Sequence, residues 1–176
     1  MQKCQVSICF ERAYMRLRES KMAMAEWESY YREARNNETV NRNIMALTGD
    51  FLSGLTGDRP KIRHMFPGAI TPGGLVRKIG SLIESDYALF AVQGNPGSVI
   101  DDLFRHAEQM LRLVTVETEV YHNFFDPEII DIIILPQSKS VLIDISAHLF
   151  NYTALLPGNK YRRFLNFDHL ANKSVI

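Results

Sequence analysis

The sequence lacks an excess of charge and a long apolar run, and each absence excludes a class of protein. Its 176 residues contain 20 basic and 20 acidic side chains, so it has no overall positive field to hold nucleic acid or an anionic membrane. No run approaches the roughly 18–20 apolar residues that a membrane span requires. The apolar stretch from Cys4 to Phe10 is short and interrupted by polar residues. We therefore expect no signal peptide and a cytoplasmic location.

Cysteine and clustered positive charge are also scarce. Cys4 and Cys9 are the only cysteines, and this C-x4-C spacing supplies too few ligands for a metal site, so reduced thiols are expected. A local basic cluster occurs at Lys160, Arg162 and Arg163. A solvated loop explains it more simply than a patch for nucleic acid, although both are compatible with the composition.

Residues 8–57 have the periodicity of helices. One helix face is predicted by apolar residues at spacings of three, four and seven: Phe10, Tyr14, Leu17, Met24, Trp27 and Tyr31. Asn37 or Thr39 can cap a second helix, which ends near Gly54 and Gly57. We expect a helical hairpin over residues 1–57, in which the first face packs against the second helix rather than against a partner. Two helices bury little surface, so the hairpin should rest on the remaining chain or on another one.

From "TGDRP" (56–60) onward the periodicity changes, and residues 58–176 are expected to form an α/β lobe. Short apolar, β-rich runs occupy 87–93, 116–122, 129–135 and 140–146, and a helical segment occupies 99–113. A strand, a helix and another strand predict a crossover within a buried, mostly parallel sheet. "PQSK" (136–139) predicts a tight turn, so the last two strands should form a hairpin.

The segment between the run at 87–93 and the helix has the outline of a phosphate-binding loop. Functional loops have the pattern G-x-x-x-x-G-K-[ST], in which backbone N–H groups and the lysine hold phosphates and the hydroxyl residue holds Mg²⁺. Gly94 takes the first position, but Val99, Ile100 and Asp101 replace the second glycine, the lysine and the hydroxyl residue. The residues that would line such a site are Gly94, Asn95, Pro96, Gly97, Ser98 and Asp101.

These replacements act against phosphate binding. A pair of unit charges about 5 Å apart is worth about 3 kcal/mol at an effective dielectric constant of about 20, so losing the lysine removes an attraction of that size. Asp101 and Asp102 would repel a phosphate, and in the first turn of the helix they interact favourably with its positive dipole end. We expect the loop to hold its shape without nucleotide.

Four segments in a fixed order carry a family resemblance. They are "RHMFPGAITPGG" (63–74), the loop at 94, "EVYHNFFDPEIIDIIIL" (119–135) and "SVLIDISAH" (140–148). Together they resemble poorly characterised bacterial P-loop ATPases that contain two tandem P-loop halves, over about residues 10–150 of this chain. The resemblance implies a truncated P-loop NTPase-like sheet, formed by the second half, preceded by the helical connector between the halves. It also implies ATP and Mg²⁺ as the ligands of an intact site.

The resemblance carries over to individual positions. In the first segment the matching residues are Arg63, His64, Phe66, Ala69, Thr71 and Pro72. In the third they are Tyr121, His122, Phe125, Asp126 and Pro127, while Asn123 stands at a family cysteine. Asp144 stands where a Walker B-type aspartate helps to position Mg²⁺, which makes it the candidate catalytic and metal-binding residue. The loss of Gly-Lys-[Ser/Thr] at 99–101 departs from the family and argues against ATP hydrolysis.

Other polar residues have a structural and a functional interpretation. His64, His122 and His148 could converge at the carboxyl edge of the sheet as catalytic or metal-binding groups, but local hydrogen bonds at strand ends are the simpler expectation. Asp126, followed by Pro127, is expected to begin a turn rather than to act as a catalytic acid. Asp144 could also simply cap its strand.

Two functions are compatible with this sequence. The first is a non-catalytic, P-loop-type domain that binds nucleotide weakly or not at all and acts as a scaffold or regulatory partner. The second is an ATPase or phosphotransferase in which Asp101 and Asp144 share a Mg²⁺, and Arg63, Arg105 or an arginine of another chain replaces the lysine. The expected partners are a complete P-loop half on another chain, or further copies joined through the helical hairpin.

Overall fold

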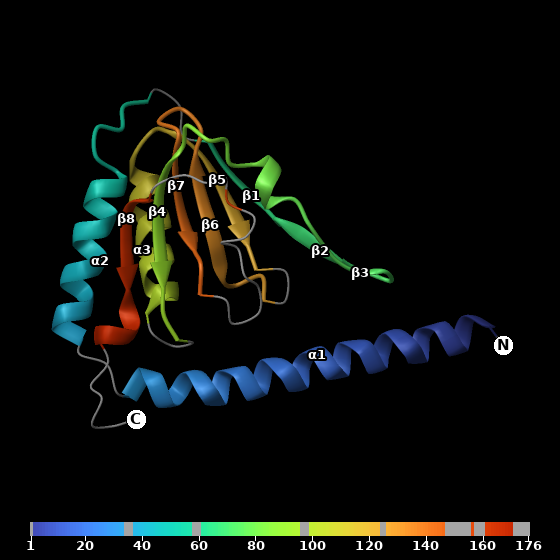
Figure 1. Ribbon diagram of the computed structural model, residues 1–176. Helices are drawn as coiled ribbons and strands as arrows, with labels where there is room; N and C mark the ends of the chain where they lie inside the picture. The colour runs from blue at the N-terminus through green and yellow to red at the C-terminus, as the bar shows by residue number, and fades with distance from the viewer. Residues whose placement is uncertain are drawn as a thin grey trace.

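An α/β lobe above a long helix makes up the described part of the protein (Figure 1). The computed structural model describes residues 2–33, 37–57, 61–95, 99–123, 126–146, 156 and 161–170. The helices are α1 (Gln2–Glu33), α2 (Asn37–Phe51) and α3 (Ile100–Leu113), with short 3-10 helices η1 (Ile79–Ser81) and η3 (Phe167–Leu170). The strands are β1 (Lys61–Met65), β2 (Gly68–Thr71), β3 (Gly74–Arg77), β4 (Ala88–Gln93), β5 (Glu117–His122), β6 (Ile130–Leu135), β7 (Ser140–Asp144) and β8 (Tyr161–Asn166).

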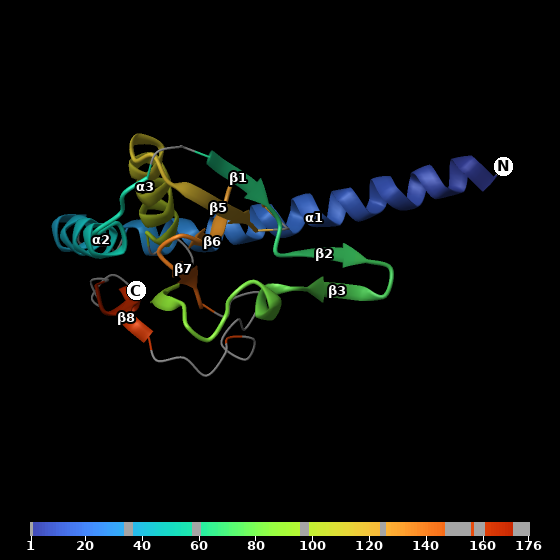
Figure 2. The ribbon, with the colours of Figure 1, turned by 90° about the horizontal axis from the view of Figure 1, so that it is seen from above.

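Six strands form one sheet in the order β1-β5-β6-β7-β4-β8. The pairs β1/β5, β7/β4 and β4/β8 are parallel, whereas β6 is antiparallel to both β5 and β7. The predicted mostly parallel α/β sheet is therefore confirmed, as is the hairpin across 136–139. Strands β2 and β3 pair separately as an antiparallel hairpin that projects from the lobe (Figure 2).

The central strands are buried on both faces because nearly all of their side chains are apolar. Every residue of β6 is buried, β4 is buried except at its two ends, and β7 is buried except at its last residue. One face carries Phe90, Ile133 and Leu142 against α2 and α3, which place Leu47 and Leu103 in the same cluster. The opposite face belongs to a second, separate cluster, whose members include Leu89, Ile132, Ile143, Ile79 and Ile83. The segment around η1 thus covers the second face.

Helix α2 is part of the core of the lobe. Its buried side chains lie three or four residues apart, as a helix covering a sheet requires: Val40, Ile44, Leu47 and Phe51. The ring of Phe51 meets that of Phe90 on β4 edge to face, with centroids 5.4 Å apart and an interplanar angle of 71°. Such aromatic pairs add to the free energy gained from burial.

Helix α1 extends beneath the lobe at a steep angle to α2 (Figure 1). The predicted pair of helices is present, but the expected packing of the first against the second is wrong. Phe10, Tyr14 and Trp27 are exposed, because α2 uses its apolar face on the sheet instead. Although α1 has 32 residues, neither it nor any other helix in the described ranges is long and apolar enough to cross a membrane.

The basic cluster near the end of the chain is not the solvated loop that was expected. Arg162 and Arg163 lie on the edge strand β8, which pairs with β4. Arg163 forms an ion pair with Asp50 of α2 and donates to the backbone oxygen of Ala46 at 3.4 Å. The third member of the cluster, Lys160, lies outside the described residues. Arg163 therefore helps to join α2 to the edge of the sheet.

We expect Phe51→Ala to lower the free energy of unfolding of the whole lobe by about 3–5 kcal/mol, because it removes a buried ring and leaves a cavity. Urea unfolding followed by circular dichroism would measure the change. Met45→Ala, on the exposed side of the same helix, is the matched control and should change stability by less than about 0.5 kcal/mol. Unfolding of α2 in a separate transition, ahead of the sheet, would contradict the assignment of α2 to this core.

Candidate functional site

The candidate site lies where three neighbouring parallel strands end. β7, β4 and β8 are adjacent in the sheet and point the same way. Their carboxyl ends meet the loop after β4 and the first turn of α3, at the lower edge of the sheet in Figure 1. Open α/β sheets bind ligands at such an edge. The fold therefore brings Gly94, Asn95, Asp101 and Asp144 to one end of the sheet, while Pro96, Gly97 and Ser98 lie outside the described residues.

The first residue of the loop is hydrogen-bonded to the end of β7. The backbone N–H of Gly94 donates to Oγ of Ser146 at 3.0 Å. Ser146 donates from its own backbone N–H to Oδ1 of Asp144 at 2.8 Å, and its hydroxyl donates to the same oxygen. This chain of bonds links the loop to the candidate Walker B aspartate through a serine that sequence analysis did not single out.

The second residue of the loop is held by a carboxylate from the end of the chain. Asn95 donates both its backbone N–H, at 2.6 Å, and its side-chain amide, at 2.7 Å, to Oδ1 of Asp168. The backbone N–H of Asp168 in turn donates to Oδ1 of Asn166 at 2.8 Å, which fixes the turn into η3. An anionic oxygen of this chain therefore accepts an N–H bond of the kind that a phosphate accepts in a functional loop.

Val99 has a backbone conformation that favours glycine. Its φ is 90° and its ψ 4°, in the left-handed region, immediately before α3. A β-branched residue is rare in this conformation, which costs of order 1–3 kcal/mol. Val99 and Ile100 are both buried in the cluster beneath α3, and this burial offsets the cost. Val99, at the position that the phosphate-loop pattern gives to its second glycine, therefore has a backbone conformation that favours glycine.

The two acidic residues considered as Mg²⁺ ligands act on each other. The pKa of Asp144 is raised from 3.8 to about 6, chiefly by burial, which outweighs the hydrogen bonds from Ser146 that lower it; the negative charge of Asp101 adds a smaller increase. The structure thus brings Asp101 and Asp144 into electrostatic contact. Within the described ranges, however, no group of three or more histidine, cysteine, aspartate or glutamate side chains could hold a metal ion.

Arg63 is not placed to replace the missing lysine. It lies on β1, four positions from β4 in the sheet order, which corresponds to about 19 Å at 4.8 Å per strand. Its guanidinium group pairs with Glu119 at 2.6 Å and Glu117 at 2.9 Å on the adjacent strand. Tyr121 donates its hydroxyl to Glu119 at 2.8 Å, and its pKa is strongly raised by burial and by that hydrogen bond. Arg63 and Tyr121, which match the first and third segments, therefore belong to one network with Glu117 and Glu119 on the β1/β5 side of the sheet, remote from the loop.

His64 and His122 meet each other but not the candidate site. Nδ1 of His64 lies 2.8 Å from Nε2 of His122, and the rings are stacked with centroids 5.1 Å apart. Nε2 of His64 lies 3.8 Å from Glu108 on α3, and the buried Nδ1 of His122 has no hydrogen-bond partner. The bond between these histidines is therefore not local to either strand end, contrary to the expectation: it joins the carboxyl ends of two parallel strands, on the β1/β5 side of the sheet. His148 and Phe125 lie outside the described residues.

Asp126 begins a turn, as expected. Its Oδ1 accepts the backbone N–H of Glu128 at 3.2 Å, and its backbone oxygen accepts that of Ile129 at 3.0 Å. Its other carboxylate oxygen accepts a bond from Lys21 of α1 at 2.7 Å. Asp126 therefore joins α1 to the loop between β5 and β6.

Comparisons with models of known protein families, with curated proteins and with solved structures found no match to this chain.

We expect Asp144→Asn to stabilise the protein at pH 8 and to have little effect at pH 4. Because folding raises the pKa of Asp144 from 3.8 to about 6, its contribution to stability is present below pH 3.8 and is lost as the pH rises through 6. That difference in pKa corresponds to about 3 kcal/mol, the largest gain expected for the variant at pH 8. Denaturant unfolding at both pH values would measure it.

Asp86→Asn is the matched control for this pH dependence. The pKa of exposed Asp86 is lowered by Lys139, so removing its charge should change stability in the opposite direction, with a loss above pH 4. An equal effect of Asp144→Asn at pH 4 and pH 8 would contradict the raised pKa.

We expect Val99→Gly to be more stable than Val99→Ala by about 1 kcal/mol, because both remove the buried side chain but only glycine adopts positive φ without strain. At an ordinary helical position the order is the reverse, since alanine is favoured there by about 1 kcal/mol. Thermal unfolding of the two variants side by side would give the sign. A more stable alanine variant would show that the left-handed conformation is not retained.

Proposed function

We propose that this chain is a non-catalytic domain related to P-loop ATPases, which binds nucleotide weakly or not at all and acts as a scaffold or regulatory partner. The observation that carries this proposal is the bond from the loop to Asp168. Both the backbone N–H and the side-chain amide of Asn95 are already donated to that carboxylate. A nucleotide phosphate would have to displace it before reaching the loop.

The charges around the loop support the same conclusion. Asp101 and Asp102 lie in the first turn of α3, Asp144 ends β7, and Asp168 contacts Asn95. At an effective dielectric constant of about 20, each carboxylate within about 5 Å of a phosphate charge would cost about 3 kcal/mol before solvent screening. The position of the lysine is held by Ile100, which is buried in the core. The residues at this site therefore fit Mg·ATP poorly.

The ATP-using enzyme is the second candidate, and one observation favours it. Asp101 and Asp144 interact, and the pKa of Asp144 is raised to about 6, as is common for acidic groups at functional sites. A Mg²⁺ ion held between the two carboxylates would relieve their repulsion. This candidate still needs a cation in place of the lysine, and Arg63 is occupied by Glu117 and Glu119. An arginine of another chain, or Arg105 on α3, would have to supply it.

Isothermal titration with Mg·ATP would test the proposal. We expect no saturable binding by the native chain up to millimolar nucleotide. Asp168→Asn should likewise show no binding of Mg·ATP, because it removes the internal anion but leaves Asp101 and Asp144 in place. The variant Val99→Gly, Ile100→Lys, Asp101→Ser combined with Asp168→Asn should gain binding, because it restores the lysine and removes two negative charges. Asp86→Asn, on the surface, is the control for a simple change in net charge.

Two further measurements make the titration decisive. Because Ile100 packs in the core, circular dichroism must show that the multiple variant is folded before its binding is interpreted. Micromolar binding by the native chain, with ATP turnover that disappears in Asp144→Ala, would refute the non-catalytic proposal and establish the second candidate. If the multiple variant is folded but does not bind Mg·ATP, this loop is not a disabled phosphate site.

A further inference from the structure

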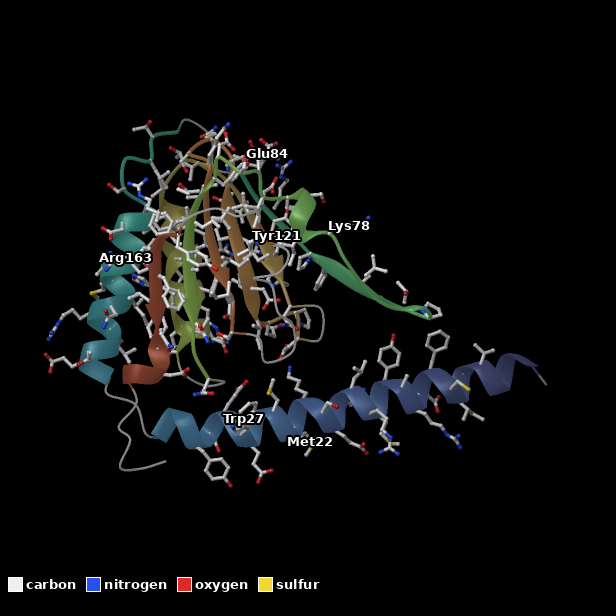
Figure 3. The ribbon with its side chains drawn as sticks, in the orientation of Figure 1. Met22, Trp27, Lys78, Glu84, Tyr121 and Arg163 are labelled. Atoms are coloured by element: carbon white, nitrogen blue, oxygen red, sulfur yellow. The ribbon has the colours of Figure 1, made fainter. Side chains whose placement is uncertain are left out.

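Helix α1 presents a line of apolar side chains on the side turned away from the lobe. Ile8, Met15 and Met22 are seven residues apart and therefore lie along one side of the helix. They are 42 %, 49 % and 73 % exposed. Met24 is partly buried and marks the opposite side, which faces the lobe. Figure 3 likewise shows Met22 on the side of the helix away from the sheet.

This apolar line, which we call the outer face, is flanked by charges of both signs. At 100° per residue, Glu11 and Arg18 lie on one flank, and Arg12 and Glu19 on the other. Glu19 accepts a bond from Arg16 at 2.7 Å. Among the described residues, none of the ion pairs involves Glu11, Arg12 or Arg18. The outer face therefore has charged groups available for a partner.

The outer face is complementary to itself under a twofold rotation. In an antiparallel pair of α1 helices centred on Met15, facing positions have residue numbers that sum to about 30. Ile8 then faces Met22 of the second copy, and Met15 faces its own counterpart. On one flank Glu11 lies beside Arg18 of the second copy, and on the other Arg12 lies beside Glu19. Each ion pair is offset by one residue, about 1.5 Å along the axis, which these long side chains can span.

We propose that the outer face of α1 is a homodimer interface, formed by two copies of this chain with their α1 helices antiparallel and centred on Met15. A second copy is the favoured occupant because each flank supplies the charge that its symmetry mate requires. The antiparallel arrangement is favoured by Glu26, which lies on the same line of the helix as Ile8. A parallel pair would place Glu26 against Glu26, whereas the antiparallel pair places it opposite residue 4, which is uncharged. This inference does not depend on the state of the loop after β4.

Sedimentation equilibrium of the full chain, from low micromolar to several hundred micromolar, would test the proposal. We expect the mean mass to rise from 20.2 kDa toward twice that value. Two double variants should each remain monomeric, because each places like charges on both flanks. One combines Glu11→Arg with Glu19→Arg, and the other combines Arg12→Glu with Arg18→Glu. An equimolar mixture of the two should form a heterodimer, because every pair then joins an arginine to a glutamate. Arg42→Glu, exposed on α2, is the control and should dimerise as the native chain does.

Spin labels at Ser29→Cys, in a chain with Cys4→Ser and Cys9→Ser, would give the orientation. Two antiparallel helices centred on Met15 separate the labelled positions by about 42 Å along the axis, whereas parallel helices place them side by side. The proposal is overturned if the native chain stays monomeric at the highest concentration, or if both charge-reversed variants still dimerise on their own. A short distance between labels would overturn the antiparallel arrangement, and circular dichroism would confirm that every variant is folded.

Discussion

The central strands of the sheet have apolar side chains on both faces, and the rest of the lobe covers these side chains. α2 and α3 enclose one face, and the segment around η1 encloses the other. Covering a sheet on both sides requires the chain to cross over it, and the crossover after β4 places the start of α3 at the carboxyl edge. The candidate site is a consequence of this burial. Its position follows from the packing of the core, whereas its chemistry depends on the few polar residues at the edge.

Those polar residues satisfy one another within the chain. Ser146 accepts a backbone bond from Gly94, and Asp168 accepts the backbone bond of Asn95. Backbone N–H groups that are left without a partner in a partly buried loop cost free energy comparable to a lost hydrogen bond. In a functional phosphate loop the ligand accepts the hydrogen bonds of these N–H groups, so the loop without its ligand is destabilised. Here side chains of the chain itself supply the acceptors for the N–H groups of Gly94 and Asn95.

Much of the sheet could be predicted from the sequence. β4, β5, β6 and β7 are apolar runs bounded by turn residues, and α3 has a strict helical period, so these elements were found within one or two residues. β1 and β8 were not predicted as strands because "KIRHM" and "YRRFLN" are largely polar, as edge strands can be. Neither Asp168 nor Ser146 could be foreseen, because they reach partners 73 and 52 residues away and only the folded sheet brings them together.

The packing of α1 was wrongly predicted for a related reason. A stripe of apolar residues shows that a helix face is to be covered, but it does not identify the covering surface. Phe10, Tyr14 and Trp27 were assigned to α2, whose own apolar face is used by the sheet. A similar limit applies to Val99. A β-branched residue is expected to avoid the left-handed conformation, but the buried surroundings of Val99 hold its backbone in that conformation.

The length of α1 has a mechanical consequence. The helix contacts the loop between β5 and β6 through Lys21 and Asp126, and from there it continues toward Gln2 as one uninterrupted rod. At 1.5 Å per residue, Gln2 lies about 28 Å beyond that contact along the helix. An α-helix changes length far less readily than a flexible linker does. A group bound near Gln2 would thereby be kept at a set separation from the sheet, so α1 has the geometry of a rigid spacer.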